Sequence, residues 1–420
     1  MDIKKIAVKG LFHTFDHEIS FKSGKIVIVI GENGIGKTTI LQIINSIFTK
    51  KFDFLYSIDF ETIEIEFSKG KWTISKDKVN NIIINKIGEK KPFVIKPIND
   101  RDSIYVRRFI VQISENEWFD RRLGGRLTRE EVIQRYGRDP LMQPENMPKW
   151  FEETITNNRI IFIKTQRLYK TEYEGDRDVK ELEYMVKTYS NDLVNLLQQN
   201  NAVFTSTSIQ LDSTFPVRLL KELGKTKKAK GINTIINNIS ELIDYRNLLS
   251  SVGIIDKQED EFISNSLENL NDNSALSILS LYISDNKQKL EVFDKTARKL
   301  DILLKVINKR CKHKKLSIDK NKGFIISSKY EDRTIDVEKL SSGEQNELII
   351  FYNLLFKTNS NDLVLIDEPE ISLHIAWQQK LISDLKEIAD ETGISLLVST
   401  HSPDIIGDNW NLVQTLSGKE

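Results

Sequence analysis

The stretch that decides the fold is Ile26-Val-Ile-Val-Ile30, followed by Gly31-Glu-Asn-Gly-Ile-Gly36 and then Lys37-Thr38. Five consecutive apolar residues that stop at a glycine predict a strand buried on both faces, as in a parallel sheet. A helical pattern over 37–48 follows the glycine-rich turn. Strand, glycine loop and helix in this order predict an α/β fold with a backbone loop at the end of a central strand.

The loop fits the pattern G-x-x-x-x-G-K-[ST], in the strand-to-helix context that this pattern requires. Its glycines let backbone N–H groups face a phosphate, and the helix N-terminus adds positive potential. We expect Lys37 to reach the β and γ phosphates of ATP and Thr38 to ligate Mg²⁺. The alternative is an ordinary glycine turn. The other predicted nucleotide-binding residues of the loop are Asn33, Gly34, Gly36 and Thr39.

A second apolar run, Leu363-Val-Leu-Ile366, ends in the adjacent carboxylates of Asp367 and Glu368. A buried strand that ends in acids can hold a metal opposite the phosphate loop on a neighbouring strand. Asp367 is the predicted Mg²⁺ ligand, and Glu368 is predicted to polarise the attacking water. Acidic residues are also common at strand ends without any function.

The amino-acid composition excludes several classes of protein. The 420 residues carry 61 Lys and Arg against 61 Asp and Glu, and 39% are hydrophobic, which excludes a disordered chain. Only 19 Gly and 8 Pro occur, so we expect long helices. The lone Cys311 allows neither an internal disulfide nor a zinc site built on Cys pairs. With no signal peptide or membrane-length apolar run, the expected place is the cytoplasm, with no membrane partner.

Periodicity divides the chain into three parts. Residues 60–95 alternate polar and β-branched residues, as in an antiparallel sheet, and 160–163 form another buried strand. From about 178 to 310 the pattern is helical, interrupted at Pro216, and without the heptads of a long coiled coil we expect a compact lobe. The predicted parts are an N-terminal head segment 1–177, a helical lobe 178–329 and a C-terminal head segment 330–420.

Two further motifs give a family resemblance. Leu340-Ser-Ser-Gly-Glu-Gln345 precedes a helical pattern and resembles the signature of ATP-binding-cassette ATPases, and Ser399-Thr-His401-Ser-Pro403 resembles their switch histidine. Taken singly, the first reads equally as a helix cap and the second as a structural histidine. The resemblance implies a P-loop ATPase head with a mixed sheet, an antiparallel β subdomain and an inserted helical lobe.

The same resemblance implies a mechanism. The chain carries one phosphate loop and one signature, so it is expected to hydrolyse ATP as a head-to-tail homodimer or higher even oligomer. Ser341 and Gly343 are then expected to act in trans, and His401 to sense the γ-phosphate. Gln166 is the candidate lid glutamine and a further Mg²⁺ ligand. Phe12 or His13 is a candidate to pack on adenine, with a core position as the alternative.

The long insertion between Lys37 and Asp367 is similar to the RecF and SMC-related branch. Segments 161–168, 210–220 and 367–377 resemble the OLD-like AAA ATPases of antiphage systems, notably the Septu ATPase subunit and ATPases found with retrons. This implies control of a separate nuclease subunit, often of the HNH type. The five histidines show no His-His-Asn grouping, and about twenty residues follow His401, so we expect any nuclease to be a partner chain.

Two alternative functions stay open at this stage. The chain could be a RecF-type DNA-repair ATPase that binds DNA directly, or a scaffold that binds nucleotide with negligible hydrolysis. Basic clusters at 121–126, 225–230 and 309–315 read either as solvated loops or as contacts to DNA or to an acidic partner. Glu370 and His374 are predicted to lie at the dimer seam rather than to bind a metal.

Overall fold

The computed structural model describes residues 2–21, 24–96, 110–112, 117–122, 124–128, 131–132, 147–173, 180–224, 231–257, 272–331 and 333–416. The chain divides into unit 1, Met1–Met185 with Ile349–Glu420, and unit 2, Val186–Leu348. Helix α10 (Ser342–Phe356) begins in unit 2 and ends in unit 1. The three-part division expected from the sequence stays a prediction.

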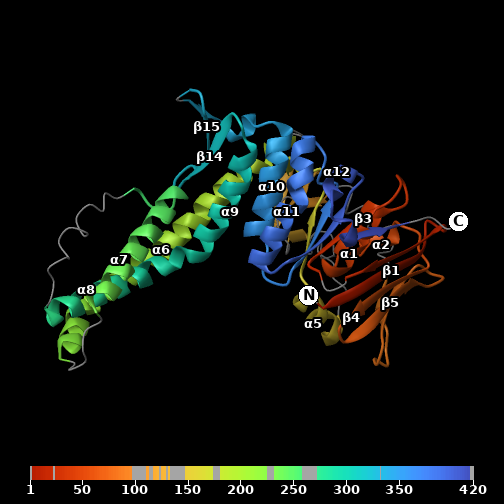
Figure 1. Ribbon diagram of the computed structural model, residues 1–420. Helices are drawn as coiled ribbons and strands as arrows, with labels where there is room; N and C mark the ends of the chain where they lie inside the picture. Colours follow the sequence, from red (N-terminus) through yellow and green to blue (C-terminus); the bar gives the residue numbers. More distant parts are fainter. Residues whose placement is uncertain are drawn as a thin grey trace. The chain divides into compact units, whose positions relative to one another are not determined.

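The central sheet of unit 1 has five strands, all parallel, in the order β11-β17-β18-β3-β19 (Figure 1). The buried strands predicted at 26–30, 160–163 and 363–366 are all in it. Because the strands are parallel, the loops that follow them meet at one edge of the sheet. The bounds are β3 Ile26–Ile30, β11 Ile160–Ile163, β17 Leu363–Asp367, β18 Ser395–Ser399 and β19 Val413–Thr415.

A second sheet in unit 1 is antiparallel, in the order β2-β1-β4-β5-β6-β7, and confirms the alternation read over 60–95. Its inner face packs on helix α1 (Lys37–Phe48) around Trp72, which is 1% exposed and stacks on Phe48 and Phe151. The bounds are β1 Ile3–Leu11, β2 Phe15–Ser20, β4 Thr62–Phe67, β5 Gly70–Lys76, β6 Ile82–Lys86 and β7 Phe93–Ile95.

Smaller elements complete unit 1. Much of the excursion expected at 105–150 lies outside the described residues, including Pro140 and Pro144, whereas Pro148 precedes α5. The elements are α2 Asp53–Tyr56, β8 Ile110–Gln112, β9 Glu117–Asp120, β10 Gly125–Thr128, α5 Lys149–Asn157, β12 Tyr169–Tyr173, β13 Lys180–Tyr184, α11 Ile375–Thr392, α12 Pro403–Ile406 and the 3₁₀ turn η3 Trp410–Leu412.

Unit 2 is mostly helical, as predicted, but differs in three details. The helix starts at Met185 rather than near 178, because 180–184 pair with β12 as an antiparallel strand. Helix α6 (Met185–Leu223) has 39 residues and is therefore roughly 58 Å long at 1.5 Å per residue. A helix of this length does not fit the compact lobe that we expected. Pro216 lies inside α6 instead of ending it.

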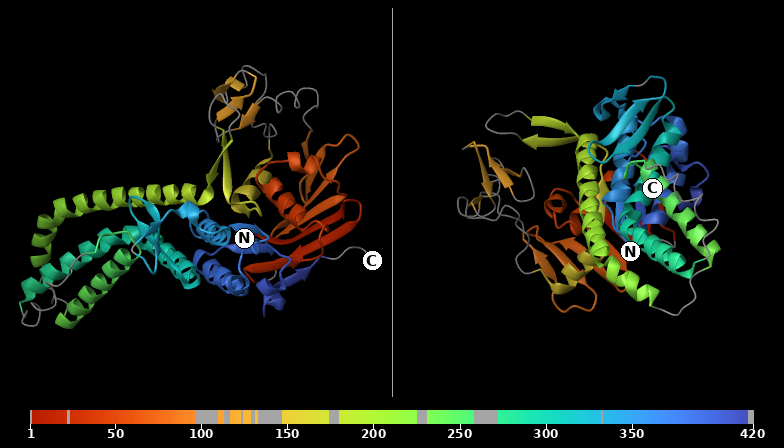
Figure 2. Two further views of the ribbon diagram at one scale, coloured as in Figure 1. Left: turned by 90° about the horizontal axis from the view of Figure 1, so that it is seen from above. Right: turned by 90° about the vertical axis from the view of Figure 1, so that its left-hand side faces the viewer.

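Helix α6 of unit 2 runs alongside α8 and α9, which lie end to end (Figure 2). Asn200 on α6 donates to Thr296 on α9 over 2.7 Å, and the rings of Phe204 and Phe293 are 5.4 Å apart. The remaining bounds are α7 Ile232–Ser251, α8 Asn273–Leu290, η1 Glu291–Phe293, α9 Asp294–Arg310, β14 Lys314–Asp319, β15 Gly323–Ser328, β16 Thr334–Ile335 and η2 Val337–Lys339.

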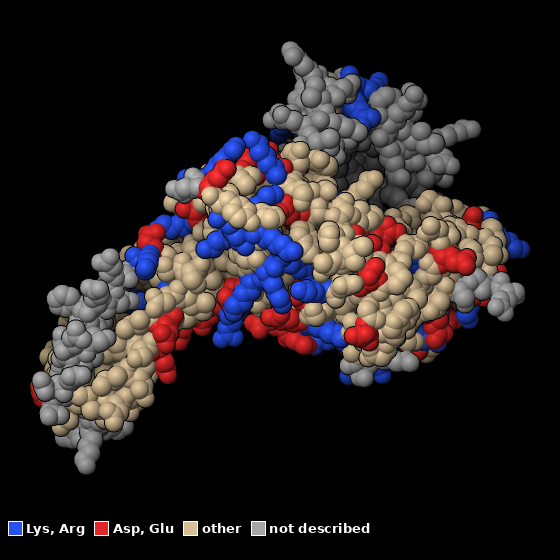
Figure 3. Space-filling model, turned by 45° about the horizontal axis from the view of Figure 1, so that its top comes forward, with Lys and Arg blue, Asp and Glu red and all other residues tan. Residues whose placement is uncertain are grey.

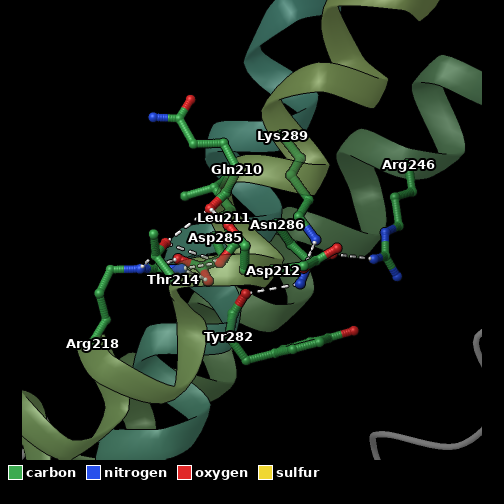
Figure 4. A network of polar contacts seen from close by, with 11 residues as sticks. Gln210, Leu211, Asp212, Thr214, Arg218, Arg246, Tyr282, Asp285, Asn286 and Lys289 are labelled. Carbon is green, nitrogen blue, oxygen red and sulfur yellow. Dashed lines mark hydrogen bonds and ion pairs between the residues drawn. The ribbon is translucent and has the colours of Figure 1, made fainter.

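A polar network explains why α6 tolerates its proline (Figure 4). Proline cannot donate a backbone N–H, which leaves a carbonyl of the preceding turn without its helical partner. Near this break, Arg218 donates to the carbonyl of Leu211 over 2.8 Å and pairs through both nitrogens with Asp285 of α8, which is 5% exposed. The α6–α8 contact therefore stabilises the helix where proline weakens it.

Candidate functional site

The glycine loop after β3 adopts the backbone that only glycine accepts readily. Gly34 and Gly36 have φ of 87° and 98°, and a Cβ at Gly36 would lie 2.6 Å from Leu11. The carbonyl of Ile35 accepts a hydrogen bond of 2.7 Å from Nε2 of His17, a buried side chain of β2. The antiparallel sheet therefore anchors the loop. Asn33 and Gly34 are exposed at its tip, and Thr39 is half-buried.

Lys37 lies against this loop with 6% of its surface exposed. Its Nζ donates to the carbonyl oxygens of Gly31 over 2.9 Å and Glu32 over 2.8 Å. Burial lowers the pKa of Lys37, and the carboxylates of Glu368, Asp367 and Glu370 act in the opposite direction. The amino group is thus held between the loop and the acids that follow β17.

Asp367 contacts the hydroxyl groups of three residues, in helix α1, at the end of β18 and after β11. Thr38 Oγ1 lies 3.0 Å from each of its carboxylate oxygens, and Ser399 and Thr165 donate over 2.6 and 2.7 Å. Asp367 is 2% exposed. A carboxylate beside a threonine hydroxyl offers the oxygen ligands that Mg²⁺ prefers, with phosphate oxygens supplying further positions. The residues present fit the predicted metal.

Glu368 and His401, which are predicted to be catalytic together with Gln166, lie next to each other. His401 Nε2 is 3.5 Å from Glu368 Oε1, and about a third of each side chain is exposed. Glu368 has φ of 44°, which is unusual for a residue other than glycine. Its backbone N–H donates to the carbonyl of Ser399 over 3.0 Å. The carboxylate is therefore accessible while its backbone is fixed.

Gln166 is exposed after β11, and its neighbour Thr165 makes the hydrogen bond to Asp367. Sequence reasoning missed Thr165 and Ser399 as partners of Asp367, and it gave Arg167 no role. All three residues lie at or after the carboxyl end of a strand in the parallel sheet, on the same edge as Asp367. Polar residues after each predicted buried strand are therefore the signal in the sequence that could have identified them.

The signature segment forms a capping box at the start of α10. The backbone N–H and hydroxyl of Ser341 donate to Glu344 Oε2 over 2.8 and 2.9 Å, and the N–H of Glu344 donates back to Ser341 Oγ over 3.3 Å. Lys314 donates to the same carboxylate oxygen over 2.7 Å. Gly343 is buried in the first turn. The helix-cap reading of this motif thus holds, and it does not exclude the signature role.

The remaining candidates are also placed. Phe12 is 40% exposed, so it is not a core residue, and its ring lies 3.5 Å from the Cβ position of Gly36. His374 accepts from the N–H of Ala376 and caps α11, and Glu370 bonds to the loop of His401. Within the described residues, no three His, Cys, Asp or Glu side chains are grouped to hold a metal ion.

Comparison with known proteins gives the class. Residues 1–406 match the family described as AAA ATPase domain, and the chain belongs to this family. No curated protein matches the chain. The chain is similar to the Smc head domain of Pyrococcus furiosus with an extended coiled coil, bound to the C-terminal domain of ScpA, at 14% identity over 96% of this chain and 91% of that chain, with a TM-score of 0.34.

A second similar structure is an Smc head bound to the C-winged helix domain of ScpA, at 12% identity over 97% of this chain and 91% of that chain, with a TM-score of 0.35. The fold class follows from the chain's own geometry: a parallel sheet with a phosphate loop, an antiparallel subdomain and a helical insertion, as in a P-loop ATPase head of the cassette type. None of the described helices has the length and apolar character needed to cross a membrane.

Proposed function

We propose that this chain binds ATP with Mg²⁺ and hydrolyses ATP. The observation that supports this most directly is the contact of Thr38 with both oxygens of Asp367, because it joins the phosphate loop to the acid that follows β17. Thr38 and Asp367, with Gln166 in addition, would hold Mg²⁺, which neutralises phosphate charge when bound. Lys37 would bind the β and γ phosphates, and Phe12 or His13 would pack on adenine.

In this proposal, Glu368 performs the proton chemistry. Its carboxylate accepts a proton from the attacking water as that water approaches the γ-phosphate. His401, whose Nε2 lies 3.5 Å from Glu368 Oε1, senses the γ-phosphate.

The expected assembly is a head-to-tail dimer, or a higher even oligomer, with two shared sites. Ser341 and Gly343 begin helix α10, and backbone N–H groups at a helix N-terminus attract phosphate. They would complete the site of the partner copy in trans. This part of the proposal rests on the signature motif.

We further propose a cytoplasmic role in antiphage defence, in which the ATPase dimer senses infection or restrains a separate nuclease subunit. The support is the resemblance of segments 161–168, 210–220 and 367–377 to the Septu and retron-associated ATPases.

A specific observation favours a second candidate, direct DNA binding. Exposed basic side chains surround the β14–β15 hairpin of unit 2, where Figure 3 shows Lys and Arg gathered; they include Lys309, Lys312, Lys315, Lys329 and Arg333. Such a surface suits a phosphate backbone. The basic cluster at 225–230 lies outside the described residues.

The first experiment measures ATP binding and turnover of the wild type and of Glu368→Gln. We expect Glu368→Gln to bind ATP normally, to lose hydrolysis by at least about 100-fold, and to accumulate ATP-bound dimers. Ser341→Ala should weaken dimer formation with ATP. A wild type that binds ATP without turnover, and a Glu368→Gln variant identical to it, would favour the scaffold alternative.

The second experiment measures the mass of the complex after co-expression with the neighbouring gene, with and without ATP. A stable assembly with a nuclease-sized chain supports the defence role. If instead the chain dimerises alone and binds DNA with a steep salt dependence, the repair role replaces it.

A further inference from the structure

We infer that Arg167 and Glu370 form an internal clamp that positions Glu368 and His401 for hydrolysis without touching the nucleotide. The inference rests on the proposed ATPase function and adds two positioning residues to it. Arg167 follows β11 and Glu370 follows β17, so they belong to neighbouring loops at the same edge of the parallel sheet.

Arg167 acts on the backbone of Glu368. The Arg167 side chain is 6% exposed, and its Nη2 donates to the carbonyl oxygen of Glu368 over 2.8 Å. Glu368 is the residue with φ of 44°, a conformation that persists only where the surroundings hold it. A buried guanidinium on that carbonyl is such a constraint, since it fixes the direction in which the peptide unit after Glu368 points.

Glu370 acts on the loop of His401. Its Oε1 accepts from the hydroxyl of Thr400 and from the backbone N–H of His401, each over 2.8 Å. A carboxylate that receives two donors from adjacent residues fixes the turn between them. The position of the His401 backbone, and so of its imidazole, therefore depends on a side chain from the neighbouring strand.

Electrostatics couple the two halves of the clamp. Among the described residues, Glu370 Oε2 has no hydrogen-bond partner although it is buried. Burial lowers the pKa of Arg167 to about 10, and the acids that oppose this are Asp367, Glu370 and Glu368, in that order. The guanidinium of Arg167 is therefore attracted by Glu370 as well as by Asp367, the predicted metal ligand.

A purely structural role makes a different prediction. If Arg167 only neutralised buried acids, its loss would lower stability and ATP affinity together. If it positions Glu368, its loss lowers kcat while ATP binding changes little, because the phosphate loop follows β3 and makes its own contacts to Lys37. The two roles therefore separate in kcat against KM.

The test compares Arg167→Leu with Arg159→Leu in the full-length chain. Arg159 lies at the opposite end of the same strand, and its Nη2 also donates to a backbone carbonyl, that of Lys357, over 3.2 Å. We expect Arg167→Leu to lower kcat on the order of 100-fold with the Kd for ATP changed less than about threefold. Arg159→Leu should leave both values near those of the wild type.

Further variants test the coupling and guard against misfolding. Glu370→Gln keeps an acceptor for Thr400 and His401 but removes the charge, so we expect a smaller loss than for Glu370→Ala. Arg167→Lys keeps the positive charge and replaces Arg167→Leu in the test if the leucine variant does not fold. Its kcat should still fall, because one ammonium group cannot replace the guanidinium geometry. Combined with Glu370→Ala, Arg167→Leu should lose less than the product of the two effects.

The outcomes distinguish the two claims. An active wild type whose kcat survives in both Arg167→Leu and Glu370→Ala would overturn the clamp and leave the ATPase proposal intact. If ATP affinity and melting temperature both fall while kcat is unchanged, Arg167 and Glu370 have a structural role only, and the clamp is also overturned. A wild type that binds ATP without hydrolysing it would overturn the proposed function and the clamp together.

Discussion

Replacing Glu347 should destabilise unit 2 more than replacing a residue of an exposed ion pair. Glu347 lies on the signature helix α10 and is 1% exposed, and it pairs with Arg310, 5% exposed, at the end of α9. Loss of Glu347 removes the ion-pair partner of a guanidinium that stays buried. Such losses cost about 3–5 kcal/mol in proteins, whereas an exposed ion pair contributes about 0–1 kcal/mol.

The expected shift follows from the size of the unit. For domains of about 150–250 residues, 1 kcal/mol corresponds to roughly 2–4 °C in melting temperature, so Glu347→Ala should lower it by roughly 6–20 °C. Lys305→Ala is the matched control, because its ion pair with Asp301 on the same helix α9 is mostly exposed. That variant should melt within about 2 °C of the wild type.

Two spectroscopic signals separate the units. All five tryptophans lie in unit 1, so their fluorescence reports unfolding there, whereas far-ultraviolet circular dichroism is sensitive to the helices of unit 2; the tryptophans are Trp72, Trp118, Trp150, Trp377 and Trp410. Glu347→Ala should shift the dichroism transition at least as much as the fluorescence transition. The double variant Arg310→Met with Glu347→Leu should recover most of the loss. An unshifted Glu347→Ala transition would refute the reasoning.

Three further predictions concern other parts of the chain. Gly36→Ala should abolish ATP binding and destabilise more than Gly34→Ala, because a Cβ at Gly36 meets a side chain at 2.6 Å while one at Gly34 meets nothing within 4 Å; equal effects in an ATP titration would contradict this. Trp72→Ala should cost about 3–5 kcal/mol in urea unfolding, and a loss under 1 kcal/mol would show that the stacked aromatic core matters little. Burial would raise the pKa of Glu344, but hydrogen bonds from Lys314 and Ser341 outweigh it and hold the pKa below the usual value for Glu. The stability from this group is therefore present at neutral pH and lost as pH falls through the folded pKa, so the deficit of Lys314→Met should shrink in acid; a deficit independent of pH would argue against the pair.

Much of the head could be predicted from the sequence because its signals are local. The run 26–30, the glycines before Lys37 and the run that ends at Asp367 each carry the pattern of a buried strand and the loop after it. The parallel arrangement then follows, since continuous apolar strands need both faces covered. Helix α1 has the bounds that the pattern over 37–48 predicts.

The helical unit was less predictable for a physical reason. Residues 180–184 carry helix-compatible side chains, but pairing with 169–173 makes them a strand, and no local signal reports a partner that lies outside the segment. Pro216 predicts an interruption, yet the Arg218–Asp285 contact between α6 and α8 stabilises the helix through it. Tertiary contacts override local preference in both places.

Motif spacing predicts that a glycine loop, a threonine and an acid form one phosphate site, because it encodes which groups a phosphate and Mg²⁺ require. The side chains that hold that acid and the residue after it can be recognised only in the folded chain. Thr165, Arg167 and Ser399 lie far from Thr38 in the chain and come together only because parallel strands bring their carboxyl ends to one edge. Long-range pairing of this kind leaves no local pattern in the sequence.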